Sequence, residues 1–381
     1  MPLAIIGNDY VKIGRNILIS DFSCANMVCV SCYPYHSEIL TKSSPMPTIR
    51  DVAKLAGVAP ITVSRVINDT SYVSQETRGR VESAIEELGY VPNMLGPSLR
   101  FQQTLTLAVV ITDITNPFWT TVTRGVEDIA QANGYSTILC NTDESDEKQD
   151  QYLHMLLRRR IDGILLVPAC SDAKPIELIR KQAIPVVVLD RRIPDVDVDI
   201  VRADSEAGAY QLTQHLISLG HRNIMMLAGP KSVSTSVDRV DGYQNALREA
   251  NLPENTSHVV WGNYSQEAGY QMTQEVLTLT PRPTAIFAAN NFVAVGVMQA
   301  LQEQGIRVPQ DIALVAFDDL PSTFTITPFF TVARQPAREM GQRATQLLLE
   351  RIKGASDVPC QHVILPTQVI IRASSGERIA A

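Results

Sequence analysis

Residues 46–99 read MPTIRDVAKLAGVAPITVSRVINDTSYVSQETRGRVESAIEELGYVPNMLGPSL. This stretch predicts three short helices followed by a fourth, marginal one. Thr48 can cap the first helix, and Asp51 three residues later gives a pattern close to a capping box. Gly57 suits a tight turn, and Pro60 suits the first position of the second helix, where a missing N–H costs nothing. A helix, a glycine turn and a second helix with exposed polar side chains are typical of a helix-turn-helix DNA-binding unit.

Each of the three helices carries apolar residues at helical spacing. Ser74 can cap the start of the third helix and Gly89 suits its end. The predicted buried positions are Val52, Leu55 and Ala56 in the first helix, Val63, Val66 and Ile67 in the second, and Val81, Ala84, Ile85 and Leu88 in the third. This period alone would fit any unit of three small helices with an apolar core, so the prediction of DNA binding depends on the polar residues of the second helix.

The runs TIRDVAKLAGV, TVSRVIN, VSQETRGRV and AIEELGYVPN resemble the lactose-repressor (LacI/GalR) family. The resemblance continues to about Arg372 and excludes residues 1–45. It implies a small all-α helix-turn-helix headpiece joined by a hinge to a two-lobed α/β core. That core is periplasmic-binding-protein-like, with parallel sheets.

The second helix offers groups suited to DNA. Hydroxyls at a helix start bind phosphates, and an arginine such as Arg65 can read guanine O6 and N7 in the major groove. Pro60 and Ile61 offer no side-chain hydrogen bond, so we expect apolar readout there, for example against a thymine methyl. Ala59 departs from the Ser or Thr that the family usually has as N-cap, a loss of about 1 kcal/mol. The DNA-binding residues that the resemblance implies are Thr48, Pro60, Ile61, Thr62, Ser64, Arg65, Asn68, Asn93 and Leu99.

The hinge is expected at residues 93–104. The resemblance implies that two hinge helices pair in a dimer and that Leu99 wedges into the minor groove and kinks the DNA. Gly96 and Pro97 both disfavour a helix interior, which leaves a plain linker as the alternative.

The expected domain organisation follows from these matches. Residues 1–45 show no clear apolar period and are expected to be a disordered extension or a mis-called start, since members of the family usually begin where Met46 stands. The expected ranges are 46–92 for the headpiece, 93–104 for the hinge, 105–372 for the effector-binding and dimerisation core, and 373–381 for a tail. Lobe 1 is expected at about 105–204 plus 335–365, and lobe 2 at about 205–334 plus a C-terminal strand.

Composition bounds the function. The chain has 381 residues, 45% hydrophobic, with a net charge of −7. No apolar run approaches the ~20 residues of a membrane span, and residues 1–20 lack the features of a secretory signal, so a cytoplasmic protein without membrane contact is expected. The acidic balance argues against a general nucleic-acid binder, and residues 46–103 hold six basic and six acidic side chains. DNA binding must therefore depend on local placement of charge and on two copies of the headpiece.

The cysteines give no firm metal site. Cys29, Cys32 and His36 resemble half of a zinc site, but no second pair follows at a suitable spacing. Cys140, Cys170 and Cys360 are expected to be buried free thiols of a cytosolic protein. No metal and no cofactor are predicted.

From Thr106 onward, apolar strands alternate with amphipathic helices, which predicts parallel sheets covered on both faces. Strands are expected at 107–111, 136–140, 163–167, 185–189, 223–228, 258–261, 285–288 and 313–316. Helices are expected at 118–133, 147–159, 175–182, 207–219, 238–250, 266–278, 293–303 and 338–353. Two such sheets in series, with the last helix returning to the first, indicate a hinged receptor whose ligand lies between the lobes at the carboxyl ends of the strands.

Polar and aromatic residues follow those strand ends. Carboxylates, amides and guanidinium groups can each hold two vicinal hydroxyls, and Phe118 with Trp119 offers a wall for stacking. The resemblance implies effector contacts at Asn116, Phe118, Asp190, Arg191, Arg239, Tyr264, Asn290, Asp318 and Gln335. Several of these could instead be helix caps or interlobe salt bridges.

The Asp190-Arg191 pair resembles that of pentose- and hexose-binding relatives, which favours a monosaccharide or close derivative. A sugar phosphate is the second choice because two or more arginines are present. A nucleobase would need fewer carboxylates.

Three functions from different classes were compared. The first is a transcriptional regulator, expected to be a repressor, that binds a pseudo-palindromic operator as a homodimer and responds to a small effector through two states of the core. The second is a solute-binding receptor for transport, which the helix-turn-helix and the lack of a signal peptide disfavour. The third is an enzyme, for which we find no G-x-S-x-G, no P-loop and no H-E-x-x-H motif. A dimer is preferred over a tetramer because the C-terminus has no leucine heptad.

Overall fold

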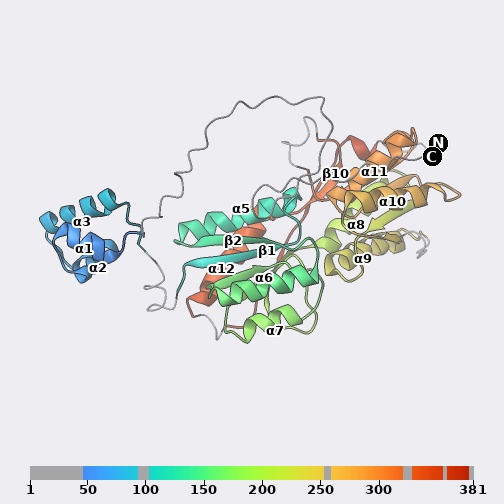
Figure 1. Cartoon of the computed structure of the whole chain (residues 1–381). Helices are drawn as coiled ribbons and strands as arrows, with labels where there is room; N and C mark the ends of the chain where they lie inside the picture. Colours follow the sequence, from blue (N-terminus) through green and yellow to red (C-terminus); the bar gives the residue numbers. More distant parts are fainter. Residues whose placement is uncertain (1–45, 93–102, 253–258, 321–327, 355–357, 377–381) are drawn as a thin grey trace, which may run out of the picture. The chain divides into compact units, whose positions relative to one another are not determined.

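A computed structural model describes residues 46–92, 103–252, 259–320, 328–354 and 358–376 (Figure 1). The chain divides into two compact units, one ending at Asn93 and one beginning at Met94, and each unit is described here by itself. The predictions for residues 1–45, including the zinc-like half-site, and for Asn93 and Leu99 lie outside the described residues.

The headpiece contains the three predicted helices, α1 (Ile49–Ala56), α2 (Pro60–Asn68) and α3 (Gln75–Leu88). Their buried core consists of Val52, Ala53, Ala56, Val63, Val66, Val81 and Ala84. The prediction for Leu55 was wrong, because 46% of this side chain is exposed and Ala53 is buried in its place. At 100° per residue, positions 52, 53 and 56 share one face of α1 and position 55 falls beside it.

The helix ends follow the predicted cap chemistry. The backbone N–H and the hydroxyl of Thr48 both donate to the Asp51 carboxylate, at 2.8 and 2.7 Å. Ser74 Oγ accepts from the Thr77 N–H at 3.3 Å. Gly57 and Gly89 end α1 and α3 with φ of 63° and 57°, where a residue without Cβ costs least. As expected for Ala59, α2 starts without a side-chain cap.

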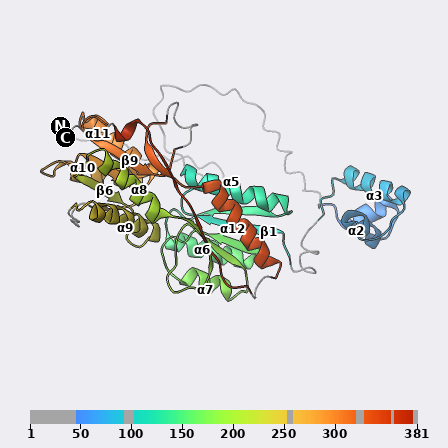
Figure 2. The same ribbon diagram turned by 180° about the vertical axis from the view of Figure 1, so that it is seen from behind.

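Lobe 1 of the core is a sheet of six parallel strands with helices on both faces (Figures 1 and 2). The strand order is β11 (His362–Leu365), β5 (Asp199–Ala203), β4 (Val186–Leu189), β3 (Gly163–Leu166), β1 (Thr106–Ile111) and β2 (Ser136–Asn141). Helices α5 (Pro117–Ala132) and α12 (Ala337–Ile352) pack on one face, and α6 (Asp146–Arg158) and α7 (Lys174–Arg180) pack on the other. The continuous apolar strands are therefore buried on both sides, as the sequence predicted.

Lobe 2 repeats this plan. Its strand order is β12 (Gln368–Ile370), β10 (Thr331–Arg334), β9 (Ala313–Phe317), β8 (Ala285–Ala288), β6 (Ile224–Ala228) and β7 (Val259–Trp261), and β12 is antiparallel to β10. Helices α8 (Ser205–Ser218) and α9 (Ser234–Glu249) cover one face, and α10 (Gln266–Leu277) and α11 (Asn291–Glu303) cover the other. A short 3-10 helix, η3 (Ala373–Ser375), follows β12.

The two lobes exchange chain segments, because α12 and β11 return to lobe 1 after β10, and β12 then belongs to lobe 2. Helices α5 and α12 pack closely at Gly125, where a Cβ would lie 2.1 Å from the Arg338 carbonyl oxygen. Strands β5, β10 and β11 were not predicted, because each has only four or five residues. Helix α9 begins at Ser234, four residues before its predicted start.

None of the helices that the structure describes is long and apolar enough to cross a membrane.

Candidate functional site

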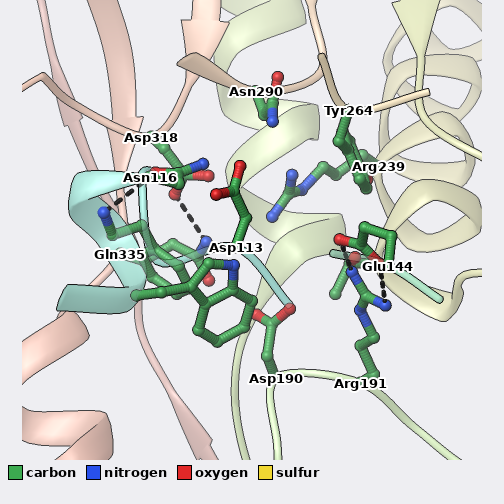
Figure 3. Close-up of a pocket in the computed structure, with 13 residues that line it drawn as sticks. Asp113, Asn116, Glu144, Asp190, Arg191, Arg239, Tyr264, Asn290, Asp318 and Gln335 are labelled. Atoms are coloured by element: carbon green, nitrogen blue, oxygen red, sulfur yellow. Dashed lines mark hydrogen bonds and ion pairs between the residues drawn. The ribbon is translucent and has the colours of Figure 1, made fainter. Parts of the chain in front are cut away.

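A cavity lies between the lobes of the core (Figure 3). All nine residues predicted to contact an effector line it, from Asn116 through Gln335. Asp113, Trp119, Glu144 and Thr235 complete the lining. Most of these residues lie within a few positions of the carboxyl end of a strand. The carboxyl ends of both sheets therefore meet at this cavity, which is where ligands bind in parallel α/β folds.

Asp190 and Asp318 occupy matching places in the two lobes. Asp190 follows β4 and Asp318 follows β9, the third strand in the order of each sheet. Their φ angles are 64° and 66°, a left-handed conformation that aspartate adopts more readily than most residues but still at a cost. Each backbone N–H donates to the neighbouring strand, at Val201 and Ala333. This conformation turns both carboxylates into the cavity (Figure 3).

Arg191 is held rigidly. It is 2% exposed, and its guanidinium forms a bidentate ion pair with Glu144 at 2.7 and 2.6 Å. The same group donates to the carbonyls of Pro168 and Ala169. Burial lowers the pKa of Arg191, but the charge and hydrogen bonds of Glu144 outweigh this and raise the pKa above its ordinary value. Arg191 Nε has no partner among the described residues.

Arg239 reaches the cavity from α9. Its guanidinium lies 3.9 Å from the ring centroid of Phe317 and 5.7 Å from that of Tyr264, and Nη1 donates to the Ala289 carbonyl at 2.7 Å. Tyr264 is fixed in turn, because its hydroxyl accepts from Ser236. Gly229 makes room for this ring, since a Cβ there would lie 2.3 Å from Tyr264 Cζ. Arg239 Nε is buried without a partner among the described residues.

The asparagines serve both as caps and as lining. Asn116 Oδ1 caps α5 by accepting from the Phe118 N–H, and Asn290 Oδ1 caps α11 by accepting from the Val293 N–H. Asn116 also exchanges two amide hydrogen bonds with Asn291, of 3.1 and 3.0 Å, which join lobe 1 to lobe 2. The interpretation of these residues as helix caps was therefore correct, and it leaves the amide N–H₂ of Asn290 without a hydrogen-bond partner among the described residues.

The two aspartates differ in their partners. Burial raises the pKa of Asp190 to about 6, against the opposing effect of Arg239 and Arg191. Burial also raises the pKa of Asp318, opposed by Arg239 and by the hydrogen bond from Gln335. That bond, from Gln335 Nε2 to Asp318 Oδ1, is 2.6 Å long. Asp190 Oδ1 and Gln335 Oε1 are buried and have no partner among the residues that the structure describes.

The cavity therefore holds more negative than positive charge. Four carboxylates, of Asp113, Glu144, Asp190 and Asp318, line it together with the two guanidinium groups. Buried polar atoms without partners are costly unless a ligand or water satisfies them. The arrangement can accept hydrogen bonds from a ligand at Asp190 and Gln335 and donate to it from Arg239 and Asn290.

Four lining residues were missed as effector contacts by sequence reasoning. Glu144 follows β2, so the rule that ligands lie at strand ends could have found it. Thr235 was lost because α9 begins earlier than predicted. Asp113 also lies just after the end of β1, and Trp119 was predicted as part of a stacking wall with Phe118 but not among the effector contacts.

The headpiece exposes the residues predicted to meet DNA. Pro60 and Arg65 are exposed, Thr62 and Ser64 are half-buried, and Ile61 is 59% exposed. The Arg65 side chain forms no hydrogen bond or ion pair with any residue that the structure describes. Asn68 Nδ2 donates back to the Ser64 carbonyl at 2.8 Å, and the Thr48 hydroxyl proton is held by Asp51. Contact with DNA stays a prediction for all of them.

Metal-binding and thiol chemistry find little support in the described residues, which contain no group of three or more His, Cys, Asp or Glu side chains able to hold a metal ion. Cys140, Cys170 and Cys360 are free, but Cys170 and Cys360 are half-buried rather than buried as predicted. Burial raises the pKa of Cys140 to about 11, and burial with a hydrogen bond to Asp146 does the same for Cys170. Both thiols are therefore protonated and unreactive near neutral pH.

Comparisons with known proteins cover nearly the whole described chain. Residues 48–93 match the family described as bacterial regulatory proteins, lacI family. Residues 104–372 match the periplasmic binding proteins and sugar binding domain of LacI family.

One curated relative and two solved structures illustrate the similarity. The HTH-type transcriptional repressor PurR of Vibrio atlanticus (strain LGP32) is 38% identical over 311 residues, 81% of this chain and 92% of the relative. The structure of the lac repressor dimer bound to operator and the anti-inducer ONPF is similar with a TM-score of 0.76 at 28% identity, over 87% of this chain and 99% of the other. A LacI family transcriptional regulator from Enterococcus faecium with bound ribose has a TM-score of 0.65 at 33% identity, over 72% of this chain and all of the other.

Proposed function

The chain belongs to the LacI family of bacterial regulatory proteins and is a DNA-binding transcriptional regulator controlled by a small effector, and we propose that this effector is a monosaccharide bound between the lobes. Asp190, Arg239, Asn290, Asp318 and Gln335 would hold its hydroxyls. Asn116, Phe118, Arg191 and Tyr264 would complete the site. The supporting observation is the set of buried, unpartnered acceptors and donors in a cavity with excess negative charge.

Charge favours a neutral ligand. A phosphate group would meet four carboxylates and only two guanidinium groups in the cavity, and Glu144 already holds both outer nitrogens of Arg191. Placing a dianion there would add like-charge repulsion in a buried site, where charges are weakly screened. The second choice from the sequence, a sugar phosphate, is therefore disfavoured.

Hydrogen-bonding capacity favours a sugar over a nucleobase. Each sugar hydroxyl both donates and accepts, which suits acceptors such as Asp190 Oδ1 beside donors such as Arg239 Nε. A nucleobase such as hypoxanthine has fewer N–H donors than a monosaccharide has hydroxyls, so it would satisfy fewer of the lining carboxylates. The aromatic residues Phe118, Trp119 and Tyr264 serve either ligand, because both present a flat apolar face. The ribose in the Enterococcus faecium relative supports the same choice.

Regulation would work through the lobes. We propose that the protein represses transcription as a homodimer on a pseudo-palindromic operator in the cytoplasm, without turnover of the effector. The hinge at residues 93–104, with Asn93 and Leu99 as DNA contacts, would transmit a change in lobe geometry to the headpiece. The effector can shift DNA affinity only as far as it binds the two states differently.

A ligand panel tests the effector class. Thermal unfolding with D-ribose, D-glucose, ribose 5-phosphate and hypoxanthine should show stabilisation by a neutral sugar, of about 2.7 kcal/mol at 100 times its dissociation constant. Calorimetry then gives the affinity, and Asp318→Ala should lose it while the protein stays folded. Tight binding of hypoxanthine, or of ribose 5-phosphate in preference to ribose, would overturn the proposal.

Arg65→Ala should abolish the preference for one DNA sequence while effector affinity stays unchanged. A lost bidentate base contact costs about 1–3 kcal/mol per half-site, and a dimer loses two. The DNA probe is the duplex that the wild-type protein selects from a random-sequence pool, measured by gel shift at matched salt. Arg80→Ala on α3 is the control, because it removes the same charge from an exposed position. A normal shift by the Arg65 variant would exclude Arg65 as a base-reading residue.

A further inference from the structure

Three consecutive arginines, Arg158, Arg159 and Arg160, are exposed where α6 ends on lobe 1. They are called here the arginine patch. None of them forms an ion pair with any residue that the structure describes. One cation in the last turn is enough to complement the partial negative charge of a helix C-terminus, and Arg158 already stands there. The other two charges are unexplained by the stability of the helix.

The arginine patch lies beside the point where the chain enters the core. The Thr104 hydroxyl donates to the Arg160 carbonyl at 3.2 Å. The nearest acid in sequence, Asp162, forms no ion pair with the patch, and its carboxylate accepts from the backbone N–H groups of Thr104 and Leu105 at 2.8 and 2.9 Å. One corner of lobe 1 thus holds both the arginine patch and the hydrogen bonds that fix Thr104 and Leu105, where the chain enters the core.

This corner is at the opposite end of the lobe 1 sheet from the effector cavity. Strand β1 starts at Thr106, next to the anchor, and its carboxyl end leads to Asp113 and Asn116 in the cavity. The arginine patch therefore has no role in holding the effector. Side chains of Gln151, His154, Met155, Arg158 and Arg159 line a shallow hollow on the outer face of α6, which Figure 1 shows covering one side of the sheet.

We propose that the arginine patch binds phosphates of the DNA to which the headpiece is bound, so that the core itself contributes to DNA affinity. The patch would supply positive charge that the headpiece lacks, because residues 46–103 carry as many acidic as basic side chains and the whole chain has a net charge of −7. Ten residues separate Pro92 from Gln103 and can span at most about 35 Å. A chain of this length can bring DNA held by the headpiece to the corner where the patch lies. Guanidinium groups bind phosphate oxygens in a bidentate manner.

Salt dependence of DNA binding distinguishes this role from others. Each protein contact with a phosphate contributes about 0.9 to the slope of log affinity against log salt. R158Q/R159Q should therefore make the slope shallower, by between about 0.9 and 3.6 for a dimer that loses one to four contacts. Adding R160N, with an asparagine that tolerates the left-handed backbone of Arg160 (φ 53°), should reduce it further.

The control is R248Q/R282Q, which removes the same charge from exposed positions on lobe 2. Both proteins are measured by fluorescence anisotropy from 50 to 300 mM KCl, on the duplex that the wild-type protein selects and on a random-sequence duplex of equal length. Because phosphate contacts carry no sequence information, the slope should fall on both duplexes for the arginine-patch variant and on neither for the control. Ribose affinity, measured by calorimetry, should be unchanged in both.

A slope equal to that of the wild type would overturn the proposal. If that equal slope comes with a loss of DNA affinity by the same factor at every salt concentration, the arginines act through the conformation of the core. Arg65→Ala tests base reading separately from phosphate binding. If Arg65→Ala loses sequence-specific DNA binding while R158Q/R159Q still lowers the salt slope on the random-sequence duplex, the two roles belong to different residues.

Discussion

Each lobe has an aspartate at positive φ directly after the third strand of its sheet: Asp190 after β4 in lobe 1 and Asp318 after β9 in lobe 2. The two carboxylates have different surroundings. Asp318 Oδ1 accepts a hydrogen bond from Gln335, whereas Asp190 Oδ1 has no partner among the described residues. Arg191, next to Asp190, is fully engaged by Glu144 and two carbonyls. Lobe 2 thus satisfies one oxygen of its carboxylate internally, and lobe 1 leaves the corresponding oxygen for the ligand.

This difference indicates a division of labour between two halves built on one plan. A carboxylate that is satisfied within the protein can be present at little cost in the empty state. A buried carboxylate without partners costs stability until a hydroxyl donates to it. We therefore expect Asp190 to couple effector binding to the stability of the core more strongly than Asp318 does.

The largest expected effect is on effector affinity. Asp190→Asn should weaken ribose binding about 100-fold, because two hydrogen bonds to a charged acceptor, each worth about 1.5–3 kcal/mol, are lost or reduced. Asparagine tolerates the left-handed backbone at this position. Calorimetry gives the affinity, and Asp318→Asn should show a loss of similar size because that side chain also faces the ligand.

The stability of the empty core should separate the two variants. The folded pKa of Asp190, about 6, lies above its ordinary value of 3.8, so the unfolded chain loses its proton first as pH rises and the fold is destabilised between these values. Asp190→Asn removes this penalty and should raise Tm at pH 7. Asp318→Asn should leave Tm unchanged or lower it, because the bond from Gln335 is disturbed. An equal rise in Tm for both variants would contradict the comparison.

The next effect concerns pH. Sugar hydroxyls donate to the ionised form of Asp190, so the effector lowers the pKa of this carboxyl and binding releases a proton when the pH is below about 6. Ribose affinity should then fall as pH drops from 6 to 5, by up to about tenfold per unit, and should be flat from 7 to 8.

Calorimetry at pH 5.5 in buffers of different ionisation enthalpy measures the released proton. Asp318→Asn is the matched variant and should keep the pH dependence, because Asp190 is intact. If proton release persists in Asp190→Asn at high ribose concentration, another group is the one that titrates.

Much of this fold could be predicted from the sequence, because many of its features are encoded by residues that lie near one another in the chain. Strands buried on both faces, such as β1, read as continuous apolar runs. The strand-end rule together with the family resemblance then gave nine lining residues of the cavity. The helix caps of the headpiece followed from local chemistry at Ser74 and Gly89. These features depend on residues near one another in the chain.

The features that escaped depend on distant contacts. Strand β5 is stabilised by pairing with β4 and β11 on either side, and its sequence is broken by Asp199 and Arg202. The pairing of Glu144 with Arg191 spans 47 positions, and no local pattern encodes it. The difference between Asp190 and Asp318 likewise became visible only with their partners in place.

The smallest expected effect concerns the contact that joins the lobes on the side of α9. Arg192 and Arg202 of lobe 1 both lie near the Asp238 carboxylate of lobe 2, with Arg192 Nε at 3.4 Å and Arg202 Nη1 at 3.7 Å from Oδ2. The Asp238 side chain is 9% exposed and that of Arg192 45%, so the ion pair is partly screened. Lobe 1 thus supplies the cations and lobe 2 the anion of an ion-pair contact between the lobes, and none of the three residues lines the cavity.

Arg192→Gln and Asp238→Asn should each weaken ribose binding about fivefold, because a partly exposed ion pair contributes up to about 1 kcal/mol. The difference in ribose affinity between the wild type and each variant should shrink as salt rises, because screening weakens the ion pair that the wild type has and the variants lack. Arg307→Gln is the control, because its ion pair with Asp311 lies within lobe 2, and it should leave ribose affinity unchanged.

The double variant Arg192→Gln/Asp238→Asn should lose less ribose affinity than the sum of the two single losses if the residues act through each other. Fully additive losses would show that the two side chains affect binding separately.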